Sequence, residues 1–146
     1  GARVGQFMAA LDDAMNALEQ TMATRLAHAA TELAQHVVRD ELRTDPARTA
    51  TVAQEAVHSV VLSAKHVVVH VHPDDEAWVQ EGAREALQAR GARCEGDATL
   101  QRGDVFIESD VGTVDARVAT RWRQVAGVLG TEMPWQASDP PKGDTP

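Results

Sequence analysis

The sequence has 146 residues, with 22 acidic and 14 lysine or arginine side chains, so its formal net charge is −8 at pH 7. This charge argues against a nucleic-acid partner and favours a basic protein surface. The single cysteine excludes an internal disulfide and suits a reducing, cytoplasmic compartment, and no apolar run is long enough for a membrane-spanning helix. The chain begins at Gly1 without Met or a leader, so we expect a truncated form.

The first 44 residues predict one long helix. Between Val4 and Arg43 there is no proline, and within that range no glycine follows Gly5. Apolar residues recur at spacings of four, four and three, an 11-residue repeat that predicts a nearly straight or slightly right-handed supercoil. These residues, which we call the stalk stripe, are Phe7, Leu11, Met15, Leu18, Met22, Leu26, Ala29, Leu33 and Val37.

The stalk stripe needs a partner along its whole length. A helix of this size extends roughly 60 Å at 1.5 Å per residue, which is farther than a small domain reaches. One alternative is that the helix packs on the domain that follows it. A parallel second copy is the simpler source of a facing helix, so we expect residues 1–45 to form a dimerisation stalk.

A globular domain is expected over residues 46–135. Thr44-Asp45-Pro46 ends the stalk, since Asp45 can cap a helix and Pro46 suits its first position. The second helix is expected to reach about Ala64. Its inner side would carry Ala50, Ala53, Val57, Val60, Val61 and Ala64.

The remaining elements alternate between strands and helices. Val67–His72 reads as a strand, and Pro73 starts a helix that runs from Asp74 to about Arg90 and stops at Gly91. Residues 93–97 form a weaker strand candidate. A hairpin built on Val105–Ile107 then turns at Gly112, which can take a positive φ.

The last helix is expected from Ala116 to Leu129, with Asp115 as its N-cap and Gly130 at its end. The order α-α-β-α-β-β-α predicts an α+β fold, a long N-terminal coiled-coil-type helix followed by a small mixed α/β domain. Residues 136–146 hold three of the six prolines and predict a disordered tail. Trp135 is expected to fold back against the domain, with an exposed anchor for a partner as the alternative.

Two groups of side chains could support chemistry. His70 and His72 share one face of a strand, which is the geometry of a two-histidine metal arm, and Asp74 and Asp75 are close in sequence. A small metal-dependent enzyme is therefore one alternative. Pro73 turns the chain, however, and no remote ligand cluster completes a site, so we expect no metal or other cofactor. The acids suit the first turn of a helix.

Other catalytic signatures are missing from the sequence. Cys94 has no helix N-terminus or histidine implied beside it, so an unreactive thiol is favoured over a nucleophile. No phosphate-binding P-loop, Gly-x-Ser-x-Gly elbow or dinucleotide fingerprint is present. We therefore expect no enzyme activity, and any nucleotide hydrolysis would belong to another chain.

Three segments resemble one family, in the same order. They are Val37–Pro46, the strand and turn Val67–Asp75, and Gly103–Trp122, whose signature residues include Gly112, Val114, Asp115, Ala116, Arg121 and Trp122. Together they resemble the FliH family, the stator proteins of the flagellar export apparatus, which is similar to virulence-type stators and to rotary-ATPase peripheral-stalk E subunits. The family often has Gly-Cys where this chain has Gly103-Asp104.

The resemblance implies a scaffold. Two copies would pair through the stalk, and their C-terminal domains would bind the N-terminal region of the flagellar export ATPase in a two-to-one complex. Binding would restrain the ATPase and help deliver it to the export gate, with the signature residues and the final helix as the docking surface. Switch-complex components are a further implied partner, although the first 40 residues lack the Trp of that contact. The equivalent stator of a virulence type III system is the alternative.

Overall fold

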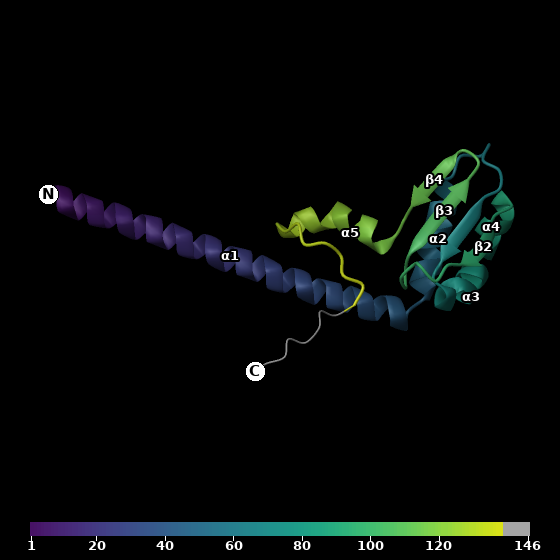
Figure 1. The fold of residues 1–146 in the computed structure, drawn as a ribbon, viewed down its shortest axis with the longest axis horizontal. Coiled ribbons are helices and arrows are strands. Elements are labelled where there is room, and N and C mark those ends of the chain that lie inside the picture. The colour runs from purple at the N-terminus through teal and green to yellow at the C-terminus, as the bar shows by residue number, and fades with distance from the viewer. Residues whose placement is uncertain (139–146) are drawn as a thin grey trace.

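The computed structural model describes residues 1–138. One long helix, α1 (Ala2–Thr44), projects from a small α/β body, as Figure 1 shows. Its break before α2 (Ala47–Ser59) lies where the sequence predicts it. The side chain of Asp45 does not cap α2. The main-chain oxygen of Asp45, and not its carboxylate, accepts a hydrogen bond from the Arg48 amide at 3.1 Å.

The body is built on a four-stranded sheet in the order β2-β1-β3-β4. Its strands are β1 (Val68–Val71), β2 (Arg93–Gly96), β3 (Val105–Ser109) and β4 (Gly112–Asp115). β1 pairs with β2 in parallel and with β3 antiparallel, and β3 and β4 form the expected hairpin. Helices α3 (Pro73–Gly82) and α4 (Arg84–Arg90) connect the two parallel strands.

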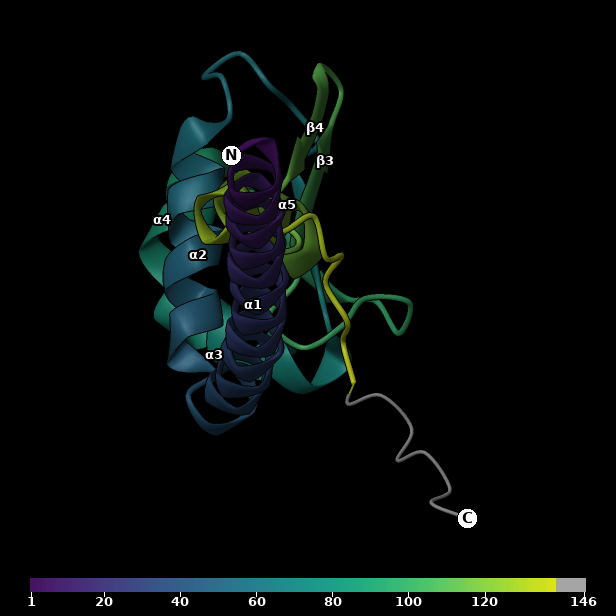
Figure 2. The ribbon, with the colours of Figure 1, turned by 90° about the vertical axis from the view of Figure 1, so that its left-hand side faces the viewer.

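Alternation along the central strands places the core on one side of the sheet. Val69, Val71, Val105 and Ile107 are buried, whereas the residues between them face outward and are partly exposed. Figure 2 shows α2, α3 and α4 on the same side. These helices, with Ala83 between α3 and α4, help to form one continuous core through Ala53, Ala56, Val57, Val79, Ala83, Ala86 and Leu87.

The α+β class and the order of elements are confirmed in outline, with differences at several boundaries. α2 ends at Ser59 instead of Ala64, which leaves Val61 exposed. The helix expected from Asp74 to Arg90 is interrupted at Ala83, directly after Gly82, a weak helix former. Three strands follow α4, where the expected order has two. With the division of the expected helix into α3 and α4, the chain therefore has one more helix and one more strand than the expected order.

The final helix, α5 (Val118–Ala126), begins two residues later than expected. A 3-10 turn, η1 (Gly127–Leu129), continues it to Gly130, whose φ of 69° ends the helix as predicted. The stop at Gly91 is also confirmed, with a φ of 59°. Both glycines therefore perform the C-terminal role that their positions indicate.

Gly82 permits α2 and α3 to pack closely, and we expect Gly82→Ala to destabilise the body. A Cβ at this position would lie 2.6 Å from Ala50 Cβ, a contact that only a backbone shift can relieve. The expected loss in the free energy of unfolding is about 1–3 kcal/mol, measured by urea denaturation. Gly127→Ala is the control, since it meets nothing within 4 Å and should be neutral or slightly stabilising. Equal effects at both positions would contradict this packing argument.

Candidate protein-binding surfaces

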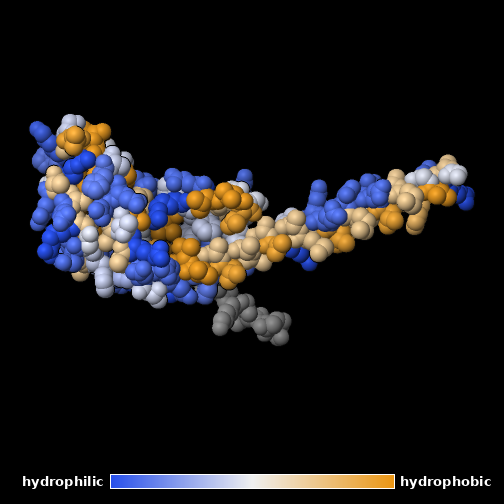
Figure 3. Space-filling view, turned by 180° about the vertical axis from the view of Figure 1, so that it is seen from behind, coloured by the Kyte–Doolittle hydropathy of each residue, from blue (hydrophilic) through white to orange (hydrophobic). Residues whose placement is uncertain are grey.

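The stalk stripe is exposed along its whole length. Its large residues, from Phe7 to Val37, retain between 45% and 72% of their accessible surface. Figure 3 shows apolar residues following one side of the projecting helix, with hydrophilic residues on the other side. An unbroken apolar row on a helix that stands free of its own body is a surface that suits another helix.

The intramolecular contacts of α1 use a different face. Thr31, Gln35 and Arg39 are spaced one helical turn apart and are 0%, 2% and 6% exposed. Leu33 and Gln35 point about 160° apart, because each residue advances by about 100° around the axis. The helix does pack on its own chain near residues 31–42, but the stalk stripe lies on the opposite side and stays open.

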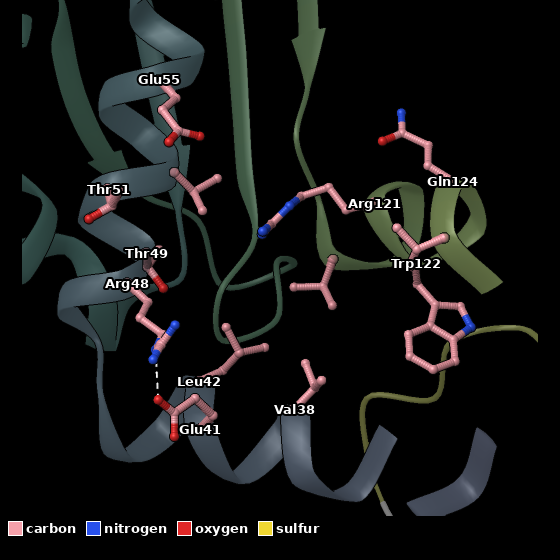
Figure 4. Close-up of a pocket in the computed structure, with 13 residues that line it drawn as sticks. Val38, Glu41, Leu42, Arg48, Thr49, Thr51, Glu55, Arg121, Trp122 and Gln124 are labelled. Atoms are coloured by element: carbon pink, nitrogen blue, oxygen red, sulfur yellow. Dashed lines mark hydrogen bonds and ion pairs between the residues drawn. The ribbon is translucent and has the colours of Figure 1, made fainter. Parts of the chain in front are cut away.

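A groove of about 640 Å³ separates α5 from α2 and the end of α1. We call it the α5 groove, and Figure 4 shows the side chains around it. Its apolar lining comes from all three helices, namely Val38, Leu42, Val52, Val118, Trp122 and Val125. Charged residues of both signs, including Arg121, Glu55 and an Arg48–Glu41 ion pair at 2.6 Å, complete the lining.

Of the six signature residues, two reach this groove. Arg121 extends from α5 toward α2, whereas the Trp122 ring points toward the C-terminal segment (Figure 4). Val114 and Ala116 pack against the core of the body. The hairpin turns at Asp110 and Val111, and Gly112, which the sequence predicts as the turn residue, is the first residue of β4, paired with Ser109 and with a φ of 144°. The signature therefore combines residues that build the domain with residues that face the groove.

Asp115 has a local role that differs from the predicted N-cap. Its carboxylate accepts hydrogen bonds from the Arg117 amide at 3.0 Å, from Arg117 Nη2 at 2.8 Å and from Thr120 Oγ1 at 2.9 Å. These bonds, chiefly those from Arg117, lower the pKa of Asp115 well below its usual range. The carboxylate thus fixes the turn that leads into α5 and remains ionised as the solution becomes acidic.

The amide at the start of α5 is bound by Asp104. Asp104 Oδ1 accepts from the Val118 amide and Oδ2 accepts from the Gln101 amide, each at 2.8 Å. Asp104 is 6% exposed, and the preceding Gly103 has a φ of 88° and no room for a side chain, because a Cβ there would lie 2.6 Å from Leu42 Cδ2 of α1. In the sequence, Asp104 stands out only as a difference from the Gly-Cys that the family often has. The feature that could have indicated its role is an acidic residue directly before a buried strand.

Asp75 binds the loop that precedes β3. It is completely buried and accepts hydrogen bonds from Arg102 Nε at 2.7 Å and from the Gly103 amide at 2.8 Å. For Asp75 the sequence predicts a dipole partner in the first turn of its helix, with a metal ligand as the alternative. Its position in the first turn of α3 is as expected, but its partners lie 27 and 28 residues away.

The two histidines of β1 have separate local partners. His70 Nε2 lies 3.2 Å from Glu108 Oε2, and His72 Nδ1 accepts a hydrogen bond from the Asp74 amide at the start of α3. Within residues 1–138, no group of three or more His, Cys, Asp or Glu side chains is arranged to hold a metal ion. Burial, with smaller contributions from Glu76 and Glu95, raises the pKa of the Cys94 thiol to about 11, which makes it a poor nucleophile.

Trp135 folds back as predicted. It is half-buried, and its ring centroid lies 5.5 Å from that of Trp122. Gln136, the first residue of the expected tail, is hydrogen-bonded to Gln35 of α1 at 3.1 Å. The rest of the tail expected to be disordered falls largely on residues 139–146, outside the described part of the chain.

Comparisons with known proteins agree with this architecture. None of the described helices is long and apolar enough to cross a membrane. The family model of the flagellar assembly protein FliH matches residues 1–125. The chain is 32% identical over 124 residues to flagellar assembly protein FliH of Salmonella typhimurium, covering 85% of this chain and 53% of that protein. For the FliH of Escherichia coli K12 the identity is 31%, covering 85% and 54%.

The chain spans about half the length of the curated relatives that it matches. The resemblance indicated by its three sequence segments is confirmed, because the matching family model covers both the stalk and most of the α/β body. This chain belongs to the FliH family of flagellar assembly proteins.

Proposed function

We propose that the chain is a non-catalytic stator and regulator of the flagellar type III export ATPase. Two copies pair through the stalk stripe, and the bodies bind the N-terminal region of one ATPase in the cytoplasm. Binding restrains the ATPase and helps deliver it to the export gate. The membership of a flagellar assembly family supports the flagellar system over a virulence system.

The observation that carries this proposal is the α5 groove. Its walls are helices, its lining is largely apolar, and charges of both signs are included in it. A groove of this kind suits an amphipathic helix, whose apolar face fills the centre while its polar flanks meet the charges. We therefore assign the docking site for a helix of the ATPase to this groove, with Arg121 and Val125 on its α5 side.

The proposed dimer rests on the second exposed surface, the stalk stripe. An apolar stripe some 30 residues long has no covering element in the described chain, and the packing of α1 on its own body leaves it free. Two stripes in parallel would cover each other and direct both bodies toward the same end. This arrangement gives one ATPase two binding bodies.

Light scattering on a sizing column tests the proposal, using the chain alone and mixed with the flagellar export ATPase of the same organism. We expect a dimer alone and a two-to-one complex in the mixture. A monomer that does not bind the ATPase would contradict both parts of the proposal.

Val125→Glu tests the groove itself, because Val125 lines it and is 57% exposed. We expect at least a tenfold weaker complex, or about 1.4 kcal/mol. Val128→Glu is the matched control, since Val128 is 89% exposed in η1 and does not line the groove. Equal losses of affinity for the two variants would place the docking site elsewhere.

A further inference from the structure

We propose that residues Thr131–Gln136, which we call the clasp, fix the position of α5 by binding to the stalk. Side chains that lie outside the α5 groove thereby set its affinity for the ATPase, a consequence that rests on the proposed function. The clasp lies beyond residue 125, where the match to the family model ends. Figure 1 shows this segment returning from α5 to α1.

The first observation is that α5 has little support from the body. Its buried residues, Val118, Trp122 and Ala126, are separate from the continuous core that the sheet and the other helices form. The groove itself lies between α5 and α2. Something other than the core must therefore hold this helix at a fixed distance from α2.

The clasp supplies this support. Trp122 Nε1 donates a hydrogen bond to the main-chain oxygen of Met133 at 3.0 Å, and the Trp122 ring packs against Trp135. The two ring planes are tilted by 51°, an arrangement that is favourable for aromatic pairs. The central residue of α5 thus has both its polar atom and its ring face occupied by the clasp.

The stalk in turn binds the clasp through a buried amide. Gln35 Nε2 donates to the main-chain oxygen of Pro134 at 2.9 Å, and Gln35 Oε1 accepts from the Gln136 amide at 3.1 Å. The nitrogen and the oxygen of the Gln35 side-chain amide are therefore both hydrogen-bonded to the backbone of one short segment, as the backbone of a neighbouring β-strand would be. Because Gln35 is only 2% exposed, few other hydrogen-bond partners could replace these bonds.

Arg39 adds a second attachment one turn further along α1. Its Nη1 donates to the main-chain oxygen of Gln136 at 2.8 Å, and its guanidinium lies 6.0 Å from the centre of the Trp135 ring. Trp135 is thus in contact with the stalk on one side and with α5 on the other. Because this face of α1 is opposite the stalk stripe, the clasp and a dimer can form together.

The N-terminus of α5 is attached through Asp104, so the helix is held at its start by Asp104 and at its centre by the clasp. Without the clasp, α5 would keep only its attachment near Val118 and the contact of η1 with α1, and its centre could move away from α2. A partner helix would then have to order α5 on binding, and the affinity would fall by that cost. Gln35 and Trp135 are positioning residues for the groove, since neither of them lines it.

Two variants test this inference, each with a matched control in the full chain. Gln35→Ala removes both amide bonds, and Gln20→Ala changes an exposed glutamine of the same helix. Trp135→Ala removes the shared ring, and Trp78→Ala removes a ring that is 53% exposed on α3. Hydrogen exchange of residues 118–129, followed by mass spectrometry, measures the stability of α5 without any partner.

We expect exchange in residues 118–129 to rise about tenfold or more in both clasp variants. Exchange in β1 and β3, and in both controls, should stay unchanged. Affinity for the flagellar export ATPase should fall about tenfold in the clasp variants only. Unchanged exchange in α5 would overturn the inference, and so would raised exchange with unchanged affinity while Val125→Glu still weakens binding. If the unmodified chain binds no ATPase, the proposed function fails and the exchange result alone decides on the clasp.

Discussion

Replacing both Leu18 and Leu26 with aspartate is expected to convert the proposed dimer into a monomer. In the proposed parallel pair of stalks these residues would lie in the seam, and the double substitution would place four carboxylates there. Burying an unpaired charge costs several kcal/mol, and the lost leucine contacts add to this cost. We expect the dimer dissociation constant to rise more than about 1,000-fold, or ~4 kcal/mol. The body should remain folded, because both residues are remote from its core.

The matched control adds the same charge to the opposite face of the stalk. Gln20 and Thr24 are exposed and lie on the far side of the helix from the stalk stripe. Gln20→Asp with Thr24→Asp should therefore remain dimeric at the same concentration in light scattering on a sizing column. If the Leu18 and Leu26 double variant also stays dimeric, the stalk stripe is not the dimer interface.

Removing the carboxylate of Asp75 is expected to destabilise the body more than any other single change considered. Asp75 is completely buried, and its partner Arg102 is 26% exposed, so the Asp75→Ala variant would lose an ion pair and leave the Gly103 amide without its acceptor. Breaking a buried pair costs about 3–5 kcal/mol. Because domains of this size are stable by only about 5–15 kcal/mol, this loss is a large fraction of the total. Urea denaturation followed by circular dichroism measures it.

The neighbouring Asp74→Ala is the control for this change. Asp74 occupies the same first turn of α3 but is largely exposed, so its removal should cost no more than about 1 kcal/mol. A double variant with Arg102→Ala then isolates the Asp75–Arg102 coupling, which we expect to exceed about 1 kcal/mol. If the two single aspartate variants are equally destabilised, the role of Asp75 is that of a dipole partner alone.

The sequence by itself determined those features that depend on local spacing. The apolar repeat predicted α1 and the side of α1 that its own chain leaves exposed, and Pro46 marked its end. Runs of strand-forming residues predicted β1 and β3, and the glycines at 91 and 130 ended their helices as expected. Periodicity and positive φ are properties of neighbouring residues, so a single sequence is sufficient to predict them.

Only the tertiary structure decided which distant groups satisfy one another. The start of α5 depends on Asp104, which lies 14 residues earlier, and the loop before β3 depends on Asp75. Gln35 binds the clasp across about 100 residues of sequence, and the α5 groove exists only because three helices meet there. The pattern of the chain marks these side chains as ordinary polar residues. Their partners are selected by burial, which forces each polar atom to find a hydrogen bond wherever the fold brings one within reach.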